Sequence, residues 1–227
     1  MERRKRMRFA VSAMLVCLVA REARGQAILA RQGDLYLRER NGQEQRLTAS
    51  GRDSDASLSA DGKTVVFVRA IRVHPDASGL GTVVEQSEVA CIDLADQRHE
   101  VQILLGTPVD ARGLHFQWFS SPRFSPDGSV VYFLVPDYST VSPGLFLLER
   151  SNGHVRFLAQ ALEFWEVAFG PYRGNLIVWQ NPMLIGGGRY DLFSMLSPSG
   201  EQVGVVGFNE GQVNAFLADQ VSAAAPR

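Results

Sequence analysis

Cysteine is almost absent from this sequence of 227 residues, which contains only Cys17 and Cys91. Cys17 lies in an N-terminal apolar segment that we expect to be removed, and Leu15 and Val16 before it lack the small side chain found next to a lipid-attachment cysteine. The mature chain would then hold one thiol and no intramolecular disulfide. Because Cys91 lies in the strand-like run 89–93, we expect it to be a small, buried apolar side chain rather than a reactive thiol.

An excess of charge of either sign is missing as well. The chain has 23 Lys and Arg residues against 24 Asp and Glu residues, for a formal net charge of -1. Nucleic-acid binding requires clustered basic residues that replace the counterions on phosphates. The strong basic cluster of this chain is confined to residues 3–8. We therefore predict that the protein does not bind nucleic acid.

Patterns that signal catalysis or metal binding are also lacking. The four histidines fall in separate segments without the spacing of a metal-ligand pair; they are His74, His99, His115 and His154. No Gly-x-Ser-x-Gly nucleophile motif is present, and the glycine run 186–188 is not followed by the Lys and Ser or Thr of a phosphate-binding loop. We expect that run to be a flexible loop between two strands. The sequence predicts no catalytic residue, no metal site and no cofactor.

Four aspartates leave a calcium site as an alternative, because closely spaced carboxylates can hold this hard cation. They are Asp53, Asp55, Asp61 and Asp127. We favour structural roles for all four. Asp61 and Asp127 precede a glycine within tight turns. Asp53 and Asp55 precede a strand in which polar residues tie neighbouring sheets together.

The N-terminus has the order of a secretory signal peptide. Basic residues 3–8 precede the apolar run 9–20, and small residues follow it. The apolar run is short for a membrane span, so an uncleaved anchor is the less favoured alternative. We expect residues 1–25 to be removed and the mature protein to be periplasmic or secreted, without an integral membrane span.

A hairpin pattern recurs through the rest of the chain. Two apolar runs flank Ser125-Pro126-Asp127-Gly128, where Pro sets φ, Asp hydrogen-bonds the backbone and Gly accepts a positive φ. The same pattern surrounds Asp61 and Gly62, and a looser version spans residues 167–179. Each copy predicts a tight hairpin, so we expect at least three hairpins of this type in the chain.

A second type of hairpin alternates with the first. Its four copies are residues 33–48 with a turn at Asn41-Gly42, residues 88–104, residues 144–159 and residues 191–206. Together the two hairpins form a four-stranded antiparallel meander that recurs roughly every 50 residues, close to the period of propeller blades. Residues 71–86 and 106–119 are expected to be loops inserted on the faces, and no amphipathic helix is expected between Gly33 and Gly207. The sequence thus predicts an all-β fold.

These repeats carry a resemblance to a known family. Residues 53–69 with 33–48 before them, and residues 121–135 with 144–148 after them, resemble the repeat of TolB-like (WD-repeat-like) β-propellers. The copy at 169–174 lacks the Asp and has one extra residue. The resemblance implies an exported propeller that binds other proteins in the bacterial envelope. The chain has no room for a further N-terminal α/β domain, so a role in the Tol-Pal system is not implied.

The repeats give a small β-propeller of about three and a half to four blades over residues 26–218, followed by a disordered tail at 219–227. An open fan of sheets would expose the faces of its end blades. We therefore expect residues 213–217 to be an inner strand that closes the ring by pairing with residues 35–48. The alternatives are an open arc completed by a second copy, as monomer or homodimer, and a fragment of a longer propeller.

The candidate binding residues are aromatic and precede inner strands, at the blade ends that open toward the central channel. They are His115, Phe116, Trp118, Phe119, Phe164 and Trp165. Exposed aromatic side chains are good interface anchors, although a core role is the alternative for each of them. The first hypothesis is therefore a non-enzymatic propeller that binds a protein or peptide. The second is the propeller scaffold of an envelope hydrolase or lyase.

Overall fold

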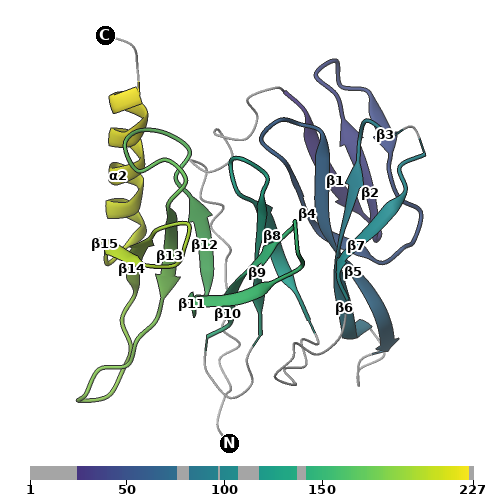
Figure 1. Cartoon of the computed structure of the whole chain (residues 1–227). Coiled ribbons are helices and arrows are strands. Elements are labelled where there is room, and N and C mark those ends of the chain that lie inside the picture. Colours follow the sequence, from purple (N-terminus) through teal and green to yellow (C-terminus); the bar gives the residue numbers. More distant parts are fainter. Residues whose placement is uncertain (1–24, 76–81, 97, 107–117, 137–141, 225–227) are drawn as a thin grey trace, which may run out of the picture.

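The computed structural model describes residues 25–75, 82–96, 98–106, 118–136 and 142–224. The expected signal peptide lies almost wholly outside these ranges, so its removal stays a prediction. In these ranges the chain forms four antiparallel sheets and a C-terminal helix (Figure 1).

Each sheet is a meander whose strands follow one another in sequence. The first contains β1 (Ala27–Arg31), β2 (Asp34–Arg38) and β3 (Glu44–Arg46). The second contains β4 (Asp53–Leu58), β5 (Thr64–Pro75), β6 (Thr82–Asp93) and β7 (Val101–Leu105). The third contains β8 (Ser120–Phe124), β9 (Val130–Val135), β10 (Gly144–Glu149) and β11 (Val155–Gln160). The fourth contains β12 (Glu163–Glu166), β13 (Leu176–Gln180), β14 (Leu192–Leu196) and β15 (Gln202–Gly207), and helix α2 (Glu210–Ala224) follows.

The first type of hairpin is confirmed in all three copies, at β4–β5, β8–β9 and β12–β13. In the turn between β8 and β9 the Gly128 N–H donates to the Ser125 carbonyl (2.9 Å), and Gly128 has φ 71. The Asp127 carboxylate accepts from the Ser125 hydroxyl and the Ser129 N–H. Asp61 accepts from Ser59 and Lys63 in the same way, so the turn role of both aspartates is confirmed.

The second type of hairpin is confirmed in all four copies, at β2–β3, β6–β7, β10–β11 and β14–β15. The expected Asn-Gly and Ser-Gly turns contain glycines of positive φ: Gly42, Gly153 and Gly200. The third inner strand differs from the prediction in its position. It is β12 at residues 163–166, whereas Val167 already begins the turn to β13.

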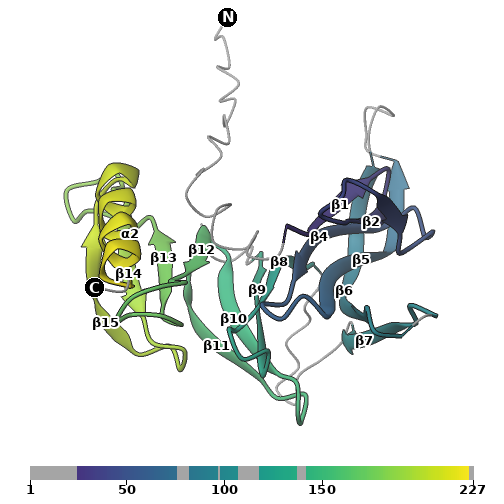
Figure 2. The same cartoon turned by 90° about the horizontal axis from the view of Figure 1, so that it is seen from above.

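Seen from above, the four sheets follow one another along an open arc, with the first sheet and α2 at its two ends (Figure 2). Strands β4, β8 and β12 form one edge of their sheets, and β7, β11 and β15 form the other. The sheets therefore stand like consecutive blades of a β-propeller that is incomplete. The predicted all-β propeller fold is confirmed.

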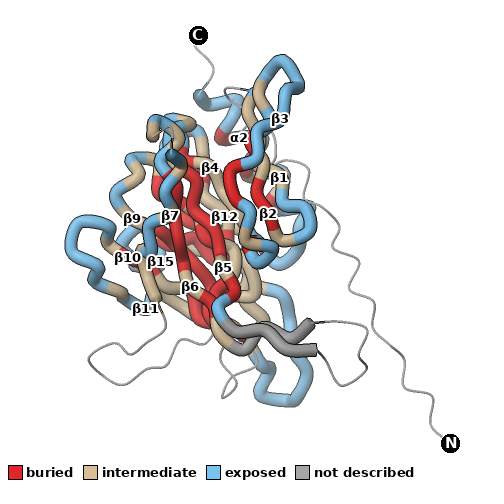
Figure 3. Tube along the Cα trace, turned by 90° about the vertical axis from the view of Figure 1, so that its right-hand side faces the viewer, coloured by how far each residue is buried: buried red, intermediate tan, exposed pale blue. Residues whose placement is uncertain are grey.

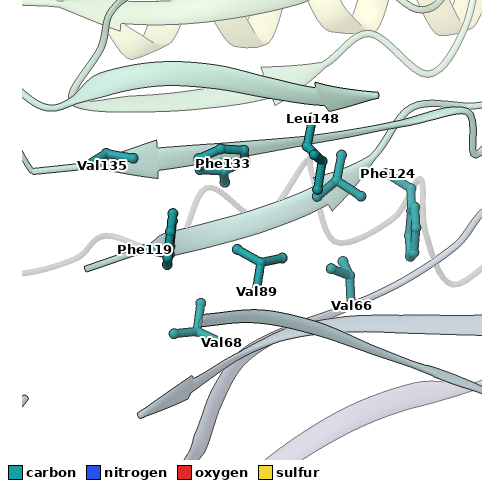
Figure 4. Close-up of a cluster of buried hydrophobic side chains, with 9 residues drawn as sticks. Val66, Val68, Val89, Phe119, Phe124, Phe133, Val135 and Leu148 are labelled. Carbon is teal, nitrogen blue, oxygen red and sulfur yellow. The ribbon is translucent and has the colours of Figure 1, made fainter. Parts of the chain in front are cut away.

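A layer of apolar side chains fills each space between neighbouring sheets. Between the second and third sheets, Val66, Val68 and Val89 meet Phe119 and Phe133, as Figure 4 shows. Leu35 and Leu37 lie in the preceding layer, and a further layer joins the third sheet to the fourth. The buried residues run along the middle strands of the sheets (Figure 3). Stability thus comes from successive contacts between neighbours, as in other repeat proteins.

The predicted closure of the ring is wrong. Residues 213–217 form no strand; they belong to α2, where Val213 and Leu217 pack on Val167, Ile177 and Phe193 of the fourth sheet. The predicted disordered tail is also corrected, because α2 continues to Ala224. The outer face of the last sheet is therefore covered by the chain's own helix.

The expected insertions have different outcomes. Residues 71–75 and 82–86 are not loop, because β5 and β6 continue through them and pair. Of the second insertion, residues 107–117 lie outside the described residues. The expectation for Cys91 is confirmed, since it is buried in β6 and burial raises the pKa of its thiol.

We expect the turn at Asp127 to make folding sensitive to acid. The hydrogen bonds from the Ser125 hydroxyl and from Ser129 lower the pKa of Asp127 to about 2. A pKa that is lower in the folded state stabilises the protein fully above the unfolded value of about 4, and this stabilisation disappears as the pH falls toward 2. Urea unfolding should be measured at several pH values, beginning at about pH 6, which is about two units above the unfolded pKa. We expect Asp127→Asn to lower the free energy of unfolding there and to lower it progressively less in acid. A cost that stays constant over this range would contradict the assignment.

Candidate interaction surface

The structure separates the aromatic residues that the sequence grouped as one site. His115 and Phe116 lie outside the described residues. Phe119 is buried between the second and third sheets, edge-on to Phe133 at 5.4 Å. Phe164 is fully buried between the third and fourth sheets. The prediction that Phe119 and Phe164 bind a partner at the surface is therefore wrong, because each side chain fills a core layer.

The two tryptophans of that group are half-buried. Trp165 packs against the layer under α2, with its ring 6.2 Å from that of Phe193. Trp118 precedes β8 and lies one residue from Phe119. Since Phe119, Phe164 and Trp165 belong to three different layers, these side chains do not form a common surface. A binding role for Trp118 and Trp165 stays a prediction.

Polar contacts connect the inner strands of successive sheets. Asp55 and Ser121 occupy the same place in β4 and β8, with φ values of 49 and 51. The Ser121 N–H donates to the Asp55 carboxylate (3.3 Å), and Arg123 Nη2 lies 3.4 Å from Glu163 Oε1 of β12. The interpretation of Asp55 as a tie between blades is confirmed. Both residues of this hydrogen bond have a left-handed backbone conformation, which the contact between the two sheets helps to maintain.

Asp53 has contacts both within its own sheet and with the first sheet. Its fully buried carboxylate accepts two hydrogen bonds from Arg69 of its own sheet, at 2.7 and 3.0 Å. Burial by itself would raise the pKa of Asp53, but the hydrogen bonds from Arg69, Thr48 and Ser50 outweigh burial and lower it. Asp53 therefore stabilises the second sheet, and its N–H, which donates to the Gly33 carbonyl at 2.8 Å, also joins β4 to the first sheet. Among the described residues, no group of three or more acidic, histidine or cysteine side chains is placed to hold a metal ion.

Exposed apolar side chains gather at the C-terminal end of the arc. Of the described large apolar residues that are exposed, Ile71, Ile103 and Phe157 lie in the second and third sheets. The others lie in the fourth sheet, its connections and α2: Phe169, Tyr172, Met183, Leu184, Ile185, Tyr190, Val203, Val205, Phe208 and Val221. Because large exposed apolar patches are typical of interaction sites, this end of the arc is the candidate interaction surface.

The most exposed of these residues lie in the connection between β13 and β14, residues 182–190, which we call the finger. It extends away from the sheets at the lower left of Figure 1. Met183 and Leu184 are exposed, and Ile185 is fully exposed at 110%. Close by, the rings of Tyr190 and Phe208 lie 6.4 Å apart. The base of the finger thus lies next to Phe208, which precedes α2.

Hydrogen bonds order the finger. The Leu184 N–H donates to the Gly188 carbonyl and the Gly187 N–H to the Leu184 carbonyl, each at 3.0 Å. At the base, Arg189 Nη1 donates to the Asn181 carbonyl at 2.8 Å. The loop expected at the glycine run is present, and it is a short hairpin of defined geometry that holds three apolar side chains in solvent.

The sequence predicts a loop at the glycine run, but the apolar residues before that run were not considered as a binding surface. The signal was adjacent to it. Met183, Leu184 and Ile185 are consecutive, so they break the alternation of a strand that buries one face. Such a run indicates a functional surface where it is exposed, and the structure shows that exposure.

Comparisons with known proteins leave the family of the chain open. No protein-family model matches the chain, and no curated protein matches it either. Among solved structures it is similar to dipeptidyl peptidase 4 from Porphyromonas gingivalis, with 13% identity, a TM-score of 0.44, and coverage of 81% of this chain and 31% of the other. For TolB from Acinetobacter baumannii the corresponding values are 14%, 0.35, 78% and 49%.

A third similar structure is the β-propeller domain of the Trilobed protease from Pyrococcus furiosus, with 12% identity, a TM-score of 0.43, and coverage of 67% of this chain and 41% of the other. The chain therefore spans less than half the length of each of these three structures. The assignment of propeller blades is based on the sheet order and packing described above. Within the described ranges, no helix has the length and apolar character needed to cross a bilayer.

Proposed function

We propose that this protein is an exported, non-enzymatic propeller that binds a protein partner in the bacterial envelope. The observation that supports the proposal is the finger, which holds Met183, Leu184 and Ile185 in solvent at the end of the arc where most exposed apolar side chains gather. The basic and apolar order of residues 1–25 supports export.

The finger has the properties of an interface anchor. Each of its three apolar side chains gains about 1.5–3 kcal/mol when it is moved from water into an apolar site. Because backbone hydrogen bonds already fix the hairpin, the finger loses little conformational entropy when a partner binds. Tyr190 and Phe208 behind the tip add aromatic contact area, which is enriched at the centre of protein interfaces.

The proposal predicts that changes in the finger reduce capture of a partner. The full-length protein with a C-terminal tag would be expressed in a Gram-negative host, located by cell fractionation, and cross-linked in the envelope fraction. We expect the protein in the periplasmic fraction, and we expect Leu184→Ser with Ile185→Ser to lower the yield of its specific cross-linked product about tenfold or more.

The matched control is Ile103→Ser, which removes an exposed apolar side chain from β7 in the second sheet. This variant should cross-link like the unchanged protein. Equal yields from the finger variant and the control would contradict the role of the finger. Retention of the protein in the cytosol would contradict export.

A further inference from the structure

The first sheet is one strand short of the other three. The second, third and fourth sheets begin with the inner strands β4, β8 and β12, whereas the first contains only β1, β2 and β3. The hairpin β2–β3 is the counterpart of β6–β7, so β1 is the counterpart of β5, the second strand of a blade. In the described part of the chain, no strand holds the inner position beside β1.

The packing of β4 and β8 shows which side chains are left partly uncovered because the first sheet has no inner strand. Aligning the turns at Gly62 and Gly128 makes Ala56 and Leu58 of β4 the counterparts of Pro122 and Phe124 of β8. Leu58 packs toward the first sheet, as Phe124 packs toward the second. Phe124 and Pro122 are buried, whereas Leu58 and Ala56 are only half-buried.

The contacts between strands place the missing strand. Strand β8 lies against both β4 and β5 of the preceding sheet. Strand β4 lies against β1, which is the counterpart of β5. By comparison with β8, β4 should also lie against an inner strand of the first sheet, the counterpart of β4 itself. A strand added beside β1 would therefore also cover Ala56 and Leu58 of β4.

The edge of β1 can accept such a strand through its backbone. The Leu47 N–H donates to the Leu35 carbonyl, so the backbone groups of Leu35 point toward β3. By the alternation of an antiparallel ladder, those of Tyr36 point toward its partner Leu29 on β1. The N–H and C=O groups of Ile28 and Ala30 then point the other way, toward the free edge. The edge contains no Lys or Pro that would protect it against pairing.

We propose that the free edge of β1 binds an extended segment of another polypeptide, which adds antiparallel to β1 as the inner strand of the first sheet. Backbone hydrogen bonds to Ile28 and Ala30 supply affinity, and alternate side chains supply specificity. Side chains of the segment that face Ile28, Ala56 and Leu58 must be apolar, and those between them can be polar. This edge lies in the first sheet and the finger in the fourth, so the two proposals can fail separately.

A matched pair of proline variants tests the edge. Ala30→Pro removes an N–H that points to the free edge, and an edge strand tolerates such a proline. Leu29→Pro removes an N–H that bonds β2 and should destabilise the sheet. Peptides displayed on phage would be selected on the purified protein. We expect selected sequences with alternating apolar residues, bound about tenfold or more weaker by Ala30→Pro at an unchanged unfolding midpoint.

Amide hydrogen exchange provides a second readout. The amides of Ile28 and Ala30 should exchange quickly in the free protein and become protected when a selected peptide is added, and the finger variant Leu184→Ser with Ile185→Ser should bind these peptides normally. Three results would overturn the proposal: selected peptides that bind the Ala30→Pro variant equally well, amides of Ile28 and Ala30 already protected in the free protein, or light scattering that shows a dimer of the unchanged protein and a monomer of the Ala30→Pro variant.

Discussion

Replacement of Gly33 by alanine is expected to lower the free energy of unfolding by about 3 kcal/mol or more. Gly33 has φ 77, in the left-handed region, and a β-carbon there would lie 2.2 Å from the carbonyl carbon and oxygen of Gly51. These are backbone atoms, so no side-chain rotation relieves the collision. The Asp53 N–H donates to the Gly33 carbonyl at 2.8 Å and holds the start of β4 against this turn. The alanine must therefore separate the first sheet from the second.

Gly42→Ala is the matched control, because Gly42 has φ 82 with no atom within 4 Å of the added β-carbon. It carries the cost of the left-handed conformation alone, about 1–2 kcal/mol. Urea unfolding followed by tryptophan fluorescence measures both variants. If Gly33→Ala and Gly42→Ala lose the same stability, the close approach of residues 33 and 51 contributes nothing.

The blades could be predicted from the sequence because their information is local. The turns at Asp61 and Asp127 contain the side-chain acceptor and the glycine that a tight hairpin requires within four residues. The Asn41-Gly42 turn is equally explicit. Strand β1 was missed because the turn after it, Gln32-Gly33, is not a typical hairpin turn. Gln32 adopts a positive φ of 52, which the sequence does not signal because Asn, Asp or Gly is the usual residue at such a position.

The C-terminal segment could not be assigned because its pattern is ambiguous at short range. Val213, Ala215 and Leu217 are apolar at every second position, as on one face of a strand, while Val213 and Leu217 are also four residues apart, as on one face of a helix. The helix start has a clear local signal that was not used. The Asn209 side chain accepts from the Gln212 N–H, as an N-cap does, and the Gln212 side chain accepts from the N–H of Phe208, the residue before the cap; this is a variant of the capping box.

The candidate site was harder to predict than the fold, because burial depends on neighbours distant in sequence. Phe119 and Phe164 precede or lie in inner strands, as expected, but each faces an adjoining sheet instead of solvent. The finger is exposed because no other described segment covers it. Nothing within residues 182–190 decides this alone, since the same apolar run would be core if a neighbour lay over it.

The two ends of the arc are covered in different ways. Leu35 and Leu37 of β2 face the second sheet, so Asp34, Tyr36 and Arg38 face outward. This outer face carries ion pairs between Arg31 and Glu44 and between Arg46 and Asp34, both at 2.6 Å. A polar outer face is what terminal units of repeat proteins need in order to remain soluble. The other end has no such face and depends on α2.

Removal of residues 208–227 is therefore expected to make the protein unfold or aggregate, although the arc is open. Without α2, the completely buried Val167 and Ile177 and the nearly buried Phe193 would meet water. If no part of the C-terminal segment closed the ring or covered a sheet, this deletion would be nearly silent; the packing of α2 on the fourth sheet gives the opposite expectation. A point substitution tests the same contact without shortening the chain. Val213→Asp places a charge at a fully buried position and should cost about 3–5 kcal/mol.

Ala215→Asp supplies the comparison, because Ala215 is an exposed position of the same helix. It introduces the same charge into the same helix, and we expect it to cost only the lower helix propensity of aspartate, about 0.7 kcal/mol. Thermal and urea unfolding of both variants measures the difference. If the two substitutions cost the same, α2 does not stabilise the fourth sheet, and the exposed face would have to be covered by another molecule. If only Val213→Asp is destabilised, the packing of α2 on the fourth sheet is what stabilises this end of the arc.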